Sequence, residues 1–146
     1  MKPTILPIGT ISHGTMRLED LIPEYVYVLG NLHLSKDERK TLNQINHAIN
    51  KESNYFESDD ASYDMEDIEN IMSNHVPTMC YFGSTEGDGS DYGVWPILDS
   101  DDVPVVKDPS ELKDINSLEA YFVNDHGNVS FYAKHGNQWV CEWEVV

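Results

Sequence analysis

Long apolar segments are missing from this sequence of 146 residues, and their absence excludes one class of protein at once. A transmembrane helix needs about 20 consecutive apolar residues, whereas the apolar runs here are only a few residues long. The first ten residues carry one lysine, but Pro3, Pro7 and Gly9 interrupt them and no long apolar region follows. We therefore expect neither a membrane span nor a signal peptide, and we expect a cytoplasmic protein.

Cysteine is scarce, with Cys80 and Cys141 each lying inside an apolar, strand-like segment. Without an export signal, the interpretation is two buried thiols in a reducing compartment. A disulfide would require their strands to be neighbours in the sheet. Nothing in their spacing is typical of zinc, and we expect no metal and no cofactor.

Lysine and arginine are absent between Lys51 and Lys107, and this gap is the most informative feature of the sequence. The whole chain has 26 acidic and 9 basic residues, a formal net charge of −17. Fourteen of the acids lie between Glu52 and Asp102, whereas the rest of the chain has twelve acids and nine bases. Most of the net negative charge therefore comes from one continuous segment.

In other respects the composition is that of a folded protein. Hydrophobic residues make up 40% of the chain, with three tryptophans and eight tyrosines among them, which favours a packed core over disorder. The length fits one ordinary domain. Neither a linker nor a repeat divides the chain, so we predict a single domain over 1–146.

Helical signals fill the first half of the sequence. Thr15 is a candidate N-cap for a helix that runs to Leu29, and Pro23 inside it predicts either a kink or a second start. Ser35 and Glu38 have the spacing of a capping box, which opens a second helix.

A polar and acidic surface loop is predicted over 51–62. A third helix is expected over 63–75, where Met65, Ile68, Ile71 and Met72 form the buried stripe, and Pro77 ends it.

From Thr78 onward the pattern changes to a period of two, which is typical of strands. In the last strand, Trp139, Cys141, Trp143 and Val145 are expected on one face, with polar residues on the other. The fold class predicted is α+β, with about three N-terminal helices packed on an antiparallel meander sheet of about five strands. The strand segments are 79–83, 92–98, 103–106, 118–123, 129–134 and 138–145.

A glycine-rich and acidic loop is predicted over 84–91. Its spacing does not match the twelve-residue calcium loop, and without a following lysine it is no phosphate loop. A solvated loop, a partner-binding loop and a metal site remain open. Catalytic motifs are lacking, because no Gly-x-Ser-x-Gly occurs and neither cysteine has a histidine at a recognisable spacing.

The acidic segment has two interpretations. It can be a solvated face that keeps the protein soluble. Alternatively it can imitate DNA, because a field of one sign costs stability and a basic nucleic-acid channel gains affinity from a rod of negative charge. Long-range steering would then speed association. Four aromatic residues would supply anchors if they remain on the surface: Tyr55, Phe56, Tyr63 and Tyr92.

Three segments together resemble a known group of sequences. They are Ile11–Pro23, Glu57–Ala61 and Tyr81–Pro96, and they are similar to a family of small acidic proteins of bacteriophages and mobile elements. The resemblance implies an accessory protein that acts inside an infected bacterial cell. By analogy alone, small acidic proteins in that setting inhibit host restriction or CRISPR nucleases, many by imitating DNA. The resemblance to this family identifies no catalytic residue in the present sequence.

The leading hypothesis is therefore a phage-type inhibitor that binds a host DNA- or RNA-binding protein with a basic channel. We expect binding without catalysis, without a membrane and without direct contact to nucleic acid, and the oligomeric state stays open. The predicted contact residues are Asp59, Asp60, Glu66, Asp67, Glu69, Glu86, Asp88, Asp91 and Tyr92.

Two alternatives remain. The first is a protein that sequesters a small ligand or nucleotide between the 12–17 turn and the 84–95 loop, with Arg17 as the anion contact. Its pocket would include His13, Thr15 and Trp95. The second is a metal-dependent enzyme with a divalent ion near Asp88 and Asp91.

Overall fold

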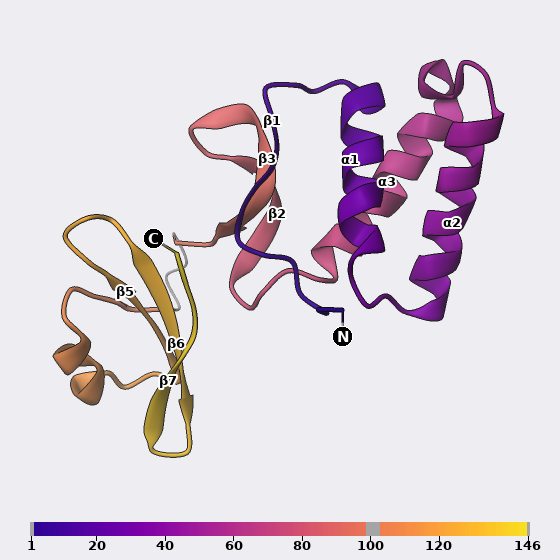
Figure 1. The fold of residues 1–146 in the computed structure, drawn as a ribbon. Helices are drawn as coiled ribbons and strands as arrows, with labels where there is room; N and C mark the ends of the chain where they lie inside the picture. The colour runs from indigo at the N-terminus through magenta and orange to yellow at the C-terminus, as the bar shows by residue number, and fades with distance from the viewer. Residues whose placement is uncertain (1, 99–102, 146) are drawn as a thin grey trace. The chain divides into compact units, whose positions relative to one another are not determined.

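Helices fill the first half of the chain and strands the second, after one short strand at the beginning (Figure 1). The computed structural model describes residues 2–98 and 103–145. Contacts divide the chain into two units, residues 1–97 and 98–146. The single domain expected from the sequence stays a prediction.

The N-terminal unit contains one three-stranded sheet and three main helices (Figure 1). Helices α1 and α3 pack on the sheet, and α2 packs on these two helices. The buried side chains of the three helices form most of the core of this unit. Its elements are β1 (Gly9–His13), α1 (Leu18–Gly30), α2 (Lys36–Lys51), the 3-10 helix η1 (Tyr55–Glu57), α3 (Asp59–Ser73), β2 (Cys80–Thr85) and β3 (Asp88–Pro96).

The start of α1 differs from the sequence prediction. The N-cap position is Arg17, and its side chain makes no capping hydrogen bond. Thr15 lies two residues earlier, where its hydroxyl donates to Asp20 at 2.6 Å and accepts from the Arg17 amide at 3.2 Å. Pro23 lies inside a helix that continues to Gly30, so it does not begin a second helix.

The predicted capping box at the start of α2 is confirmed. The Glu38 amide donates to the Ser35 hydroxyl at 3.1 Å, and the Ser35 amide donates to the Glu38 carboxylate at 2.9 Å. Two backbone N–H groups that a helix start leaves unpaired are thereby satisfied.

Helix α3 begins four residues earlier than the sequence prediction. Ser58 is its N-cap and accepts a hydrogen bond from the Ala61 amide at 3.3 Å. The predicted loop over 51–62 is therefore wrong in part, because η1 and the first turn of α3 lie within 55–62. The first turn of α3 is mostly polar and acidic, so the spacing of apolar residues did not predict it. Asp59 and Asp60 are nevertheless favourable there, because negative charge is stabilised near the N-terminus of a helix.

The sheet of the N-terminal unit has the order β1-β3-β2 and is antiparallel throughout. Phe82 on β2 meets Tyr25 of α1 edge to face, with ring centroids 5.3 Å apart. A Cβ added at Gly93 would stand 2.1 Å from the carbonyl oxygen of Gly9. Glycine at this position therefore lets β1 approach β3 closely.

The predicted loop over 84–91 is wrong. Strand β2 ends at Thr85 and β3 begins at Asp88, so a two-residue turn joins them. The register shifts between Ser84 and Thr85. Most of the glycine-rich segment therefore belongs to strands β2 and β3. Its glycines do not prevent this, because glycine in a strand is compatible with a bulge or a close backbone approach.

The second unit has a separate sheet, and the predicted single antiparallel meander is therefore wrong. The order is β4-β5-β6-β7, and β4 runs parallel to β5. The 3-10 helix η2 lies in the connection that makes this parallel pairing possible. The elements are β4 (Val105–Val106), η2 (Pro109–Asp114), β5 (Glu119–Val123), β6 (Val129–His135) and β7 (Gln138–Val145).

The predicted alternation along β7 is also wrong. Tyr132 pairs with Cys141 and Phe131 with Trp143, so the register shifts by one residue at Glu142. Because directly opposed residues share a face, Trp143 lies on the side of Phe131, away from Trp139 and Cys141. Cys141 is exposed rather than buried, whereas Cys80 is buried as predicted.

Within residues 2–98 and 103–145, no helix combines the length and the apolar character needed to cross a bilayer.

Candidate functional site

The outer side of α3 presents most of the predicted contact residues to solvent. Its inner stripe, Ala61, Met65, Ile68 and Met72, is buried, so residues on the other faces of the helix point outward. The exposed acids of the helix are Asp59, Asp60, Glu66, Asp67 and Glu69.

Within the described residues, these carboxylates form no ion pairs with cationic side chains. The helix contains no lysine or arginine. Asp64, the partly buried sixth acid, accepts a hydrogen bond from the Tyr55 hydroxyl at 2.6 Å. Burial and this contact raise the pKa of Tyr55 well above its usual value.

The charge density of α3 approaches that of a nucleic acid. Its six acids lie between Asp59 and Glu69, which corresponds to about 15 Å of helix axis at about 1.5 Å per residue. One carboxylate therefore occurs about every 2.5–3 Å. Duplex DNA carries one charge per about 1.7 Å of axis, and each strand one per about 3.4 Å.

Tyr63 lies in the middle of this acidic face, and its exposed fraction is 65%. Four acids flank it at positions i−4, i−3, i+3 and i+4 along the helix, where side chains are neighbours. The other three proposed aromatic anchors are less accessible. Tyr55 is buried with 2% exposed, and Phe56 and Tyr92 are partly buried.

The Glu69 carboxyl group is partly shielded from solvent. Burial raises its pKa, and the neighbouring Glu66 raises it further. Burial raises the pKa of Tyr25 well above its usual value, and the neighbouring Tyr92 and Glu69 raise it further.

The acids of the β2–β3 hairpin are in three different environments. Glu86 is exposed in the two-residue turn. Asp88 accepts from the amide and hydroxyl of Ser90 at 3.0 and 2.8 Å, and these bonds lower its pKa. Asp91 is partly buried, and within the described residues its Oδ1 has no hydrogen-bond partner.

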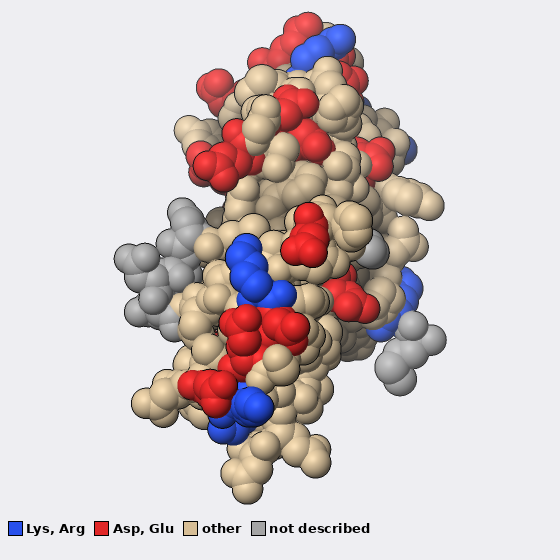
Figure 2. Space-filling model, turned by 90° about the vertical axis from the view of Figure 1, so that its left-hand side faces the viewer, with Lys and Arg blue, Asp and Glu red and all other residues tan. Residues whose placement is uncertain are grey.

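The acidic turn at 99–102, which the sequence placed with this surface, lies outside the described residues. On the face in Figure 2, acidic side chains stand in several separate groups, some of them beside lysine or arginine. The candidate acidic surface is the outer side of α3, where the exposed acids share one face of a helix, and the acids of the β2–β3 hairpin form a second group.

Cations gather on a different helix, a feature that the sequence analysis did not use. Four of the nine basic residues belong to α2: Lys36, Arg39, Lys40 and Lys51. Three of them line a shallow depression with His47. Counting charges for each expected helix would have revealed this contrast with α3.

Arg17, the proposed anion-binding residue of the ligand-binding alternative, already contacts acidic side chains. The Arg17 guanidinium donates to Glu19, with 2.8 Å from Nε to the carboxylate, and lies 3.9 Å from Asp20. These contacts raise the pKa of Arg17. The structure thus brings Thr15 and Arg17 together, but around neighbouring carboxylates.

His13 and Trp95 lie far apart along β3. His13 pairs with Asp91 in the sheet and approaches Asp88 at 3.4 Å. Trp95 is four residues from Asp91, about 13 Å along an extended strand, and its indole N–H donates to the Gly83 carbonyl at 2.9 Å. A ligand-binding role for these residues stays a prediction.

The metal-dependent alternative has no preformed cluster in the described ranges. Across 2–98 and 103–145, no group of three or more His, Cys, Asp or Glu side chains is placed to hold a metal ion.

Comparisons with models of protein families, with curated proteins and with solved structures found no match for this chain. The case for a function therefore rests on the chemistry of the surface described above.

Proposed function

We propose that this protein is a stoichiometric inhibitor that binds a nucleic-acid-binding protein of a bacterial host, such as a defence nuclease. The candidate acidic surface would occupy the basic channel in which the partner otherwise holds DNA or RNA. The resemblance to phage and mobile-element proteins supports this setting.

The observation that carries the proposal is the row of uncompensated carboxylates on α3. Within the described part of the chain, none of the six has a cationic partner, so their field extends into solvent. A basic channel releases counterions when it binds phosphates, and carboxylates at a similar spacing can replace those phosphates. Opposite charge also steers the two proteins together.

Tyr63 supplies the apolar part of this surface. Tyrosine and arginine are enriched among the residues that dominate binding energy, and an arginine of the partner can stack on the Tyr63 ring as a cation–π contact. One of the flanking acids, Asp59 or Asp67, would then hydrogen-bond the same guanidinium group. This arrangement favours a partner rich in arginine over one rich in lysine.

The proposal is tested by capture from a bacterial lysate. The immobilised protein is incubated with lysate at about 0.05 M salt and washed at about 0.5 M, and the released proteins are identified. We expect nucleic-acid-binding proteins, and we expect duplex DNA to release them at low salt because it competes for the same channel.

A pair of variants separates a specific surface from general negative charge. Glu66→Lys with Asp67→Lys reverses two exposed, unpaired acids of α3, and Glu111→Lys with Asp125→Lys reverses two exposed acids of the second unit. Both change the net charge equally. Capture should fall at least about tenfold for the first pair only. Equal capture by both pairs, or partners that DNA does not displace, would contradict the proposal.

A further inference from the structure

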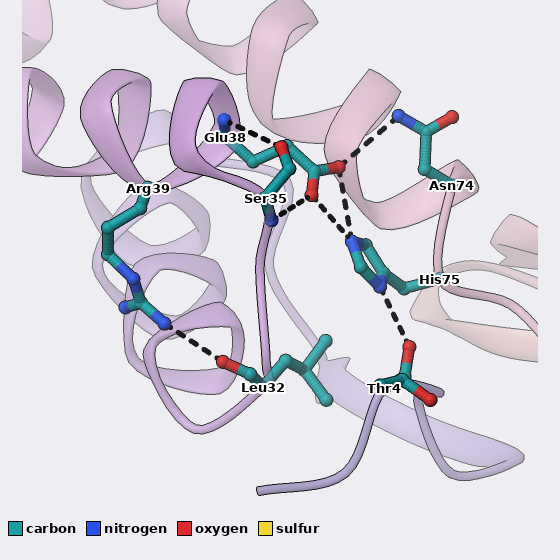
Figure 3. A network of polar contacts seen from close by, with 7 residues as sticks. All are labelled: Thr4, Leu32, Ser35, Glu38, Arg39, Asn74 and His75. Carbon is teal, nitrogen blue, oxygen red and sulfur yellow. Dashed lines mark hydrogen bonds and ion pairs between the residues drawn. The ribbon is translucent and has the colours of Figure 1, made fainter.

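His75, just after α3, joins three separate segments of the N-terminal unit (Figure 3). Its Nδ1 lies 2.8 Å from the carbonyl oxygen of Thr4, and its Nε2 lies 3.0 and 3.1 Å from the two carboxylate oxygens of Glu38. The side chains of His75 and Glu38 are only 12% and 15% exposed. The ring therefore bridges the first residues of the chain and the start of α2.

Both groups that face the ring are acceptors. A backbone carbonyl can only accept, and so can an ionised carboxylate. Burial opposes ionisation of Glu38, but hydrogen bonds from the Ser35 amide and from the side chains of His75 and Asn74 outweigh it and lower the pKa of Glu38 to about 2. Both ring nitrogens of His75 thus face acceptors, a geometry that favours the doubly protonated ring.

The residues before β1 also form hydrogen bonds with other parts of the N-terminal unit. Within this N-terminal arm, residues 2–8, the Lys2 ammonium donates to the Gly30 carbonyl at 3.1 Å. The Pro3 carbonyl accepts from the His33 amide at 2.8 Å, and the Leu6 amide donates to the His75 carbonyl at 2.8 Å. Leu6 itself is buried with 1% exposed, so the arm covers part of the core.

Loss of one ring proton affects the two sides of His75 unequally. The carboxylate of Glu38 is the stronger acceptor, because a charge-assisted hydrogen bond is about twice as strong as a neutral one. The remaining proton therefore stays on Nε2, and a lone pair on Nδ1 then faces the Thr4 carbonyl oxygen. Two acceptors at this distance repel one another, so the arm loses a contact while the link between α2 and α3 is kept.

We propose that His75 is a pH-sensitive latch, which holds the N-terminal arm when the ring is doubly protonated and releases it when Nδ1 loses its proton. Glu38 from α2 is the one charged side chain among the described partners of the ring. The arm contributes the Thr4 carbonyl, and Asn74 contributes a neutral amide that also donates to Glu38. The latch does not depend on the proposed function.

Amide hydrogen exchange and ring NMR on the full chain test this proposal. Near pH 5.5 the His75 ring should show two N–H signals. After correction for intrinsic exchange, the Leu6 amide should exchange at least about tenfold faster near pH 8 than near pH 5.5. Amides in the middle of α3 should keep their protection. A single ring N–H signal near pH 5.5 would overturn the proposal. So would a corrected exchange rate of the Leu6 amide that differs by less than about twofold between the two pH values.

Two variants and a control isolate the ring. A glutamine at this position, in His75→Gln, cannot donate to both Thr4 and Glu38 and does not titrate. In this variant the exchange rate of the Leu6 amide, corrected for intrinsic exchange, should not vary between pH 5.5 and pH 8. Glu38→Gln keeps the capping box but removes the charge, so release should occur at a lower pH. His47→Gln removes an exposed histidine of α2 and should behave as the wild type. A His75→Gln variant that keeps the full pH dependence would refute the latch.

Discussion

Gly93 is the residue at which the N-terminal sheet tolerates no side chain. In Gly93→Ala the new methyl group would overlap the backbone of Gly9, so β1 must move away from β3. We expect the free energy of unfolding to fall by about 2 kcal/mol or more, measured by urea denaturation. Gly89→Ala is the matched control, because its Cβ meets no atom within 4 Å, and a similar loss there would contradict the steric explanation.

The Glu38 carboxylate contributes to stability in a way that is lost in acid. Its pKa falls from 4.5 to about 2 on folding, so the folded state binds this proton less readily than the unfolded state. The stabilising contribution is complete above about pH 4.5 and is lost as the pH falls towards 2. Glu38→Gln should therefore lose less stability than the wild type over that interval. The exposed Glu24→Gln should follow the wild-type curve, and identical curves for all three would contradict this account.

At the scale of elements, the start of α3 depends on one hydroxyl. Ser58 accepts from the Ala61 amide and donates to the Tyr55 carbonyl, so it caps α3 and closes η1. Ser58→Ala should lower the free energy of unfolding by about 1 kcal/mol. Ser62→Ala, at an exposed position inside the same helix, should be neutral or slightly stabilising, and thermal unfolding of the two variants checks the difference.

Local signals predicted the helices better than the sheets. Ser35 and Glu38 lie three residues apart, so their capping box was readable from the sequence. The pairing of Gly9 with Val94 joins residues that are far apart in the chain, and no local pattern reports it. The bulge at Glu142 likewise depends on which residues β6 presents to β7, so alternation alone put Trp143 on the wrong face.

The candidate site was predictable in composition but not in accessibility. The absence of lysine and arginine between Lys51 and Lys107 indicated, from the sequence alone, where the negative charge is concentrated. The sequence did not distinguish Tyr63, which is exposed, from Tyr55, which is buried and bonded to Asp64. The Glu38–His75 contact was out of reach because it joins residues 37 positions apart.

At the scale of the whole molecule, a net charge of −17 should make stability depend on salt. Like charges on α3 repel, and the screening length shortens from about 30 Å at 0.01 M salt to about 10 Å at 0.1 M. The urea midpoint should therefore rise with sodium chloride. Glu66→Lys with Asp67→Lys should raise the low-salt midpoint and flatten this dependence more than Glu111→Lys with Asp125→Lys. A midpoint that falls with salt would contradict dominant self-repulsion.

The pairing of β1 with β3 also sets an order of assembly during translation. Gly9 leaves the ribosome long before its partner Val94, and at about 5–20 residues per second the delay is about 4–17 s. Helices form in microseconds, so α1, α2 and α3 can associate while β1 still lacks a neighbour. The first strand to be synthesised is thus the last to find its place in the sheet, and the nascent chain must keep Gly9–His13 from pairing elsewhere in the meantime.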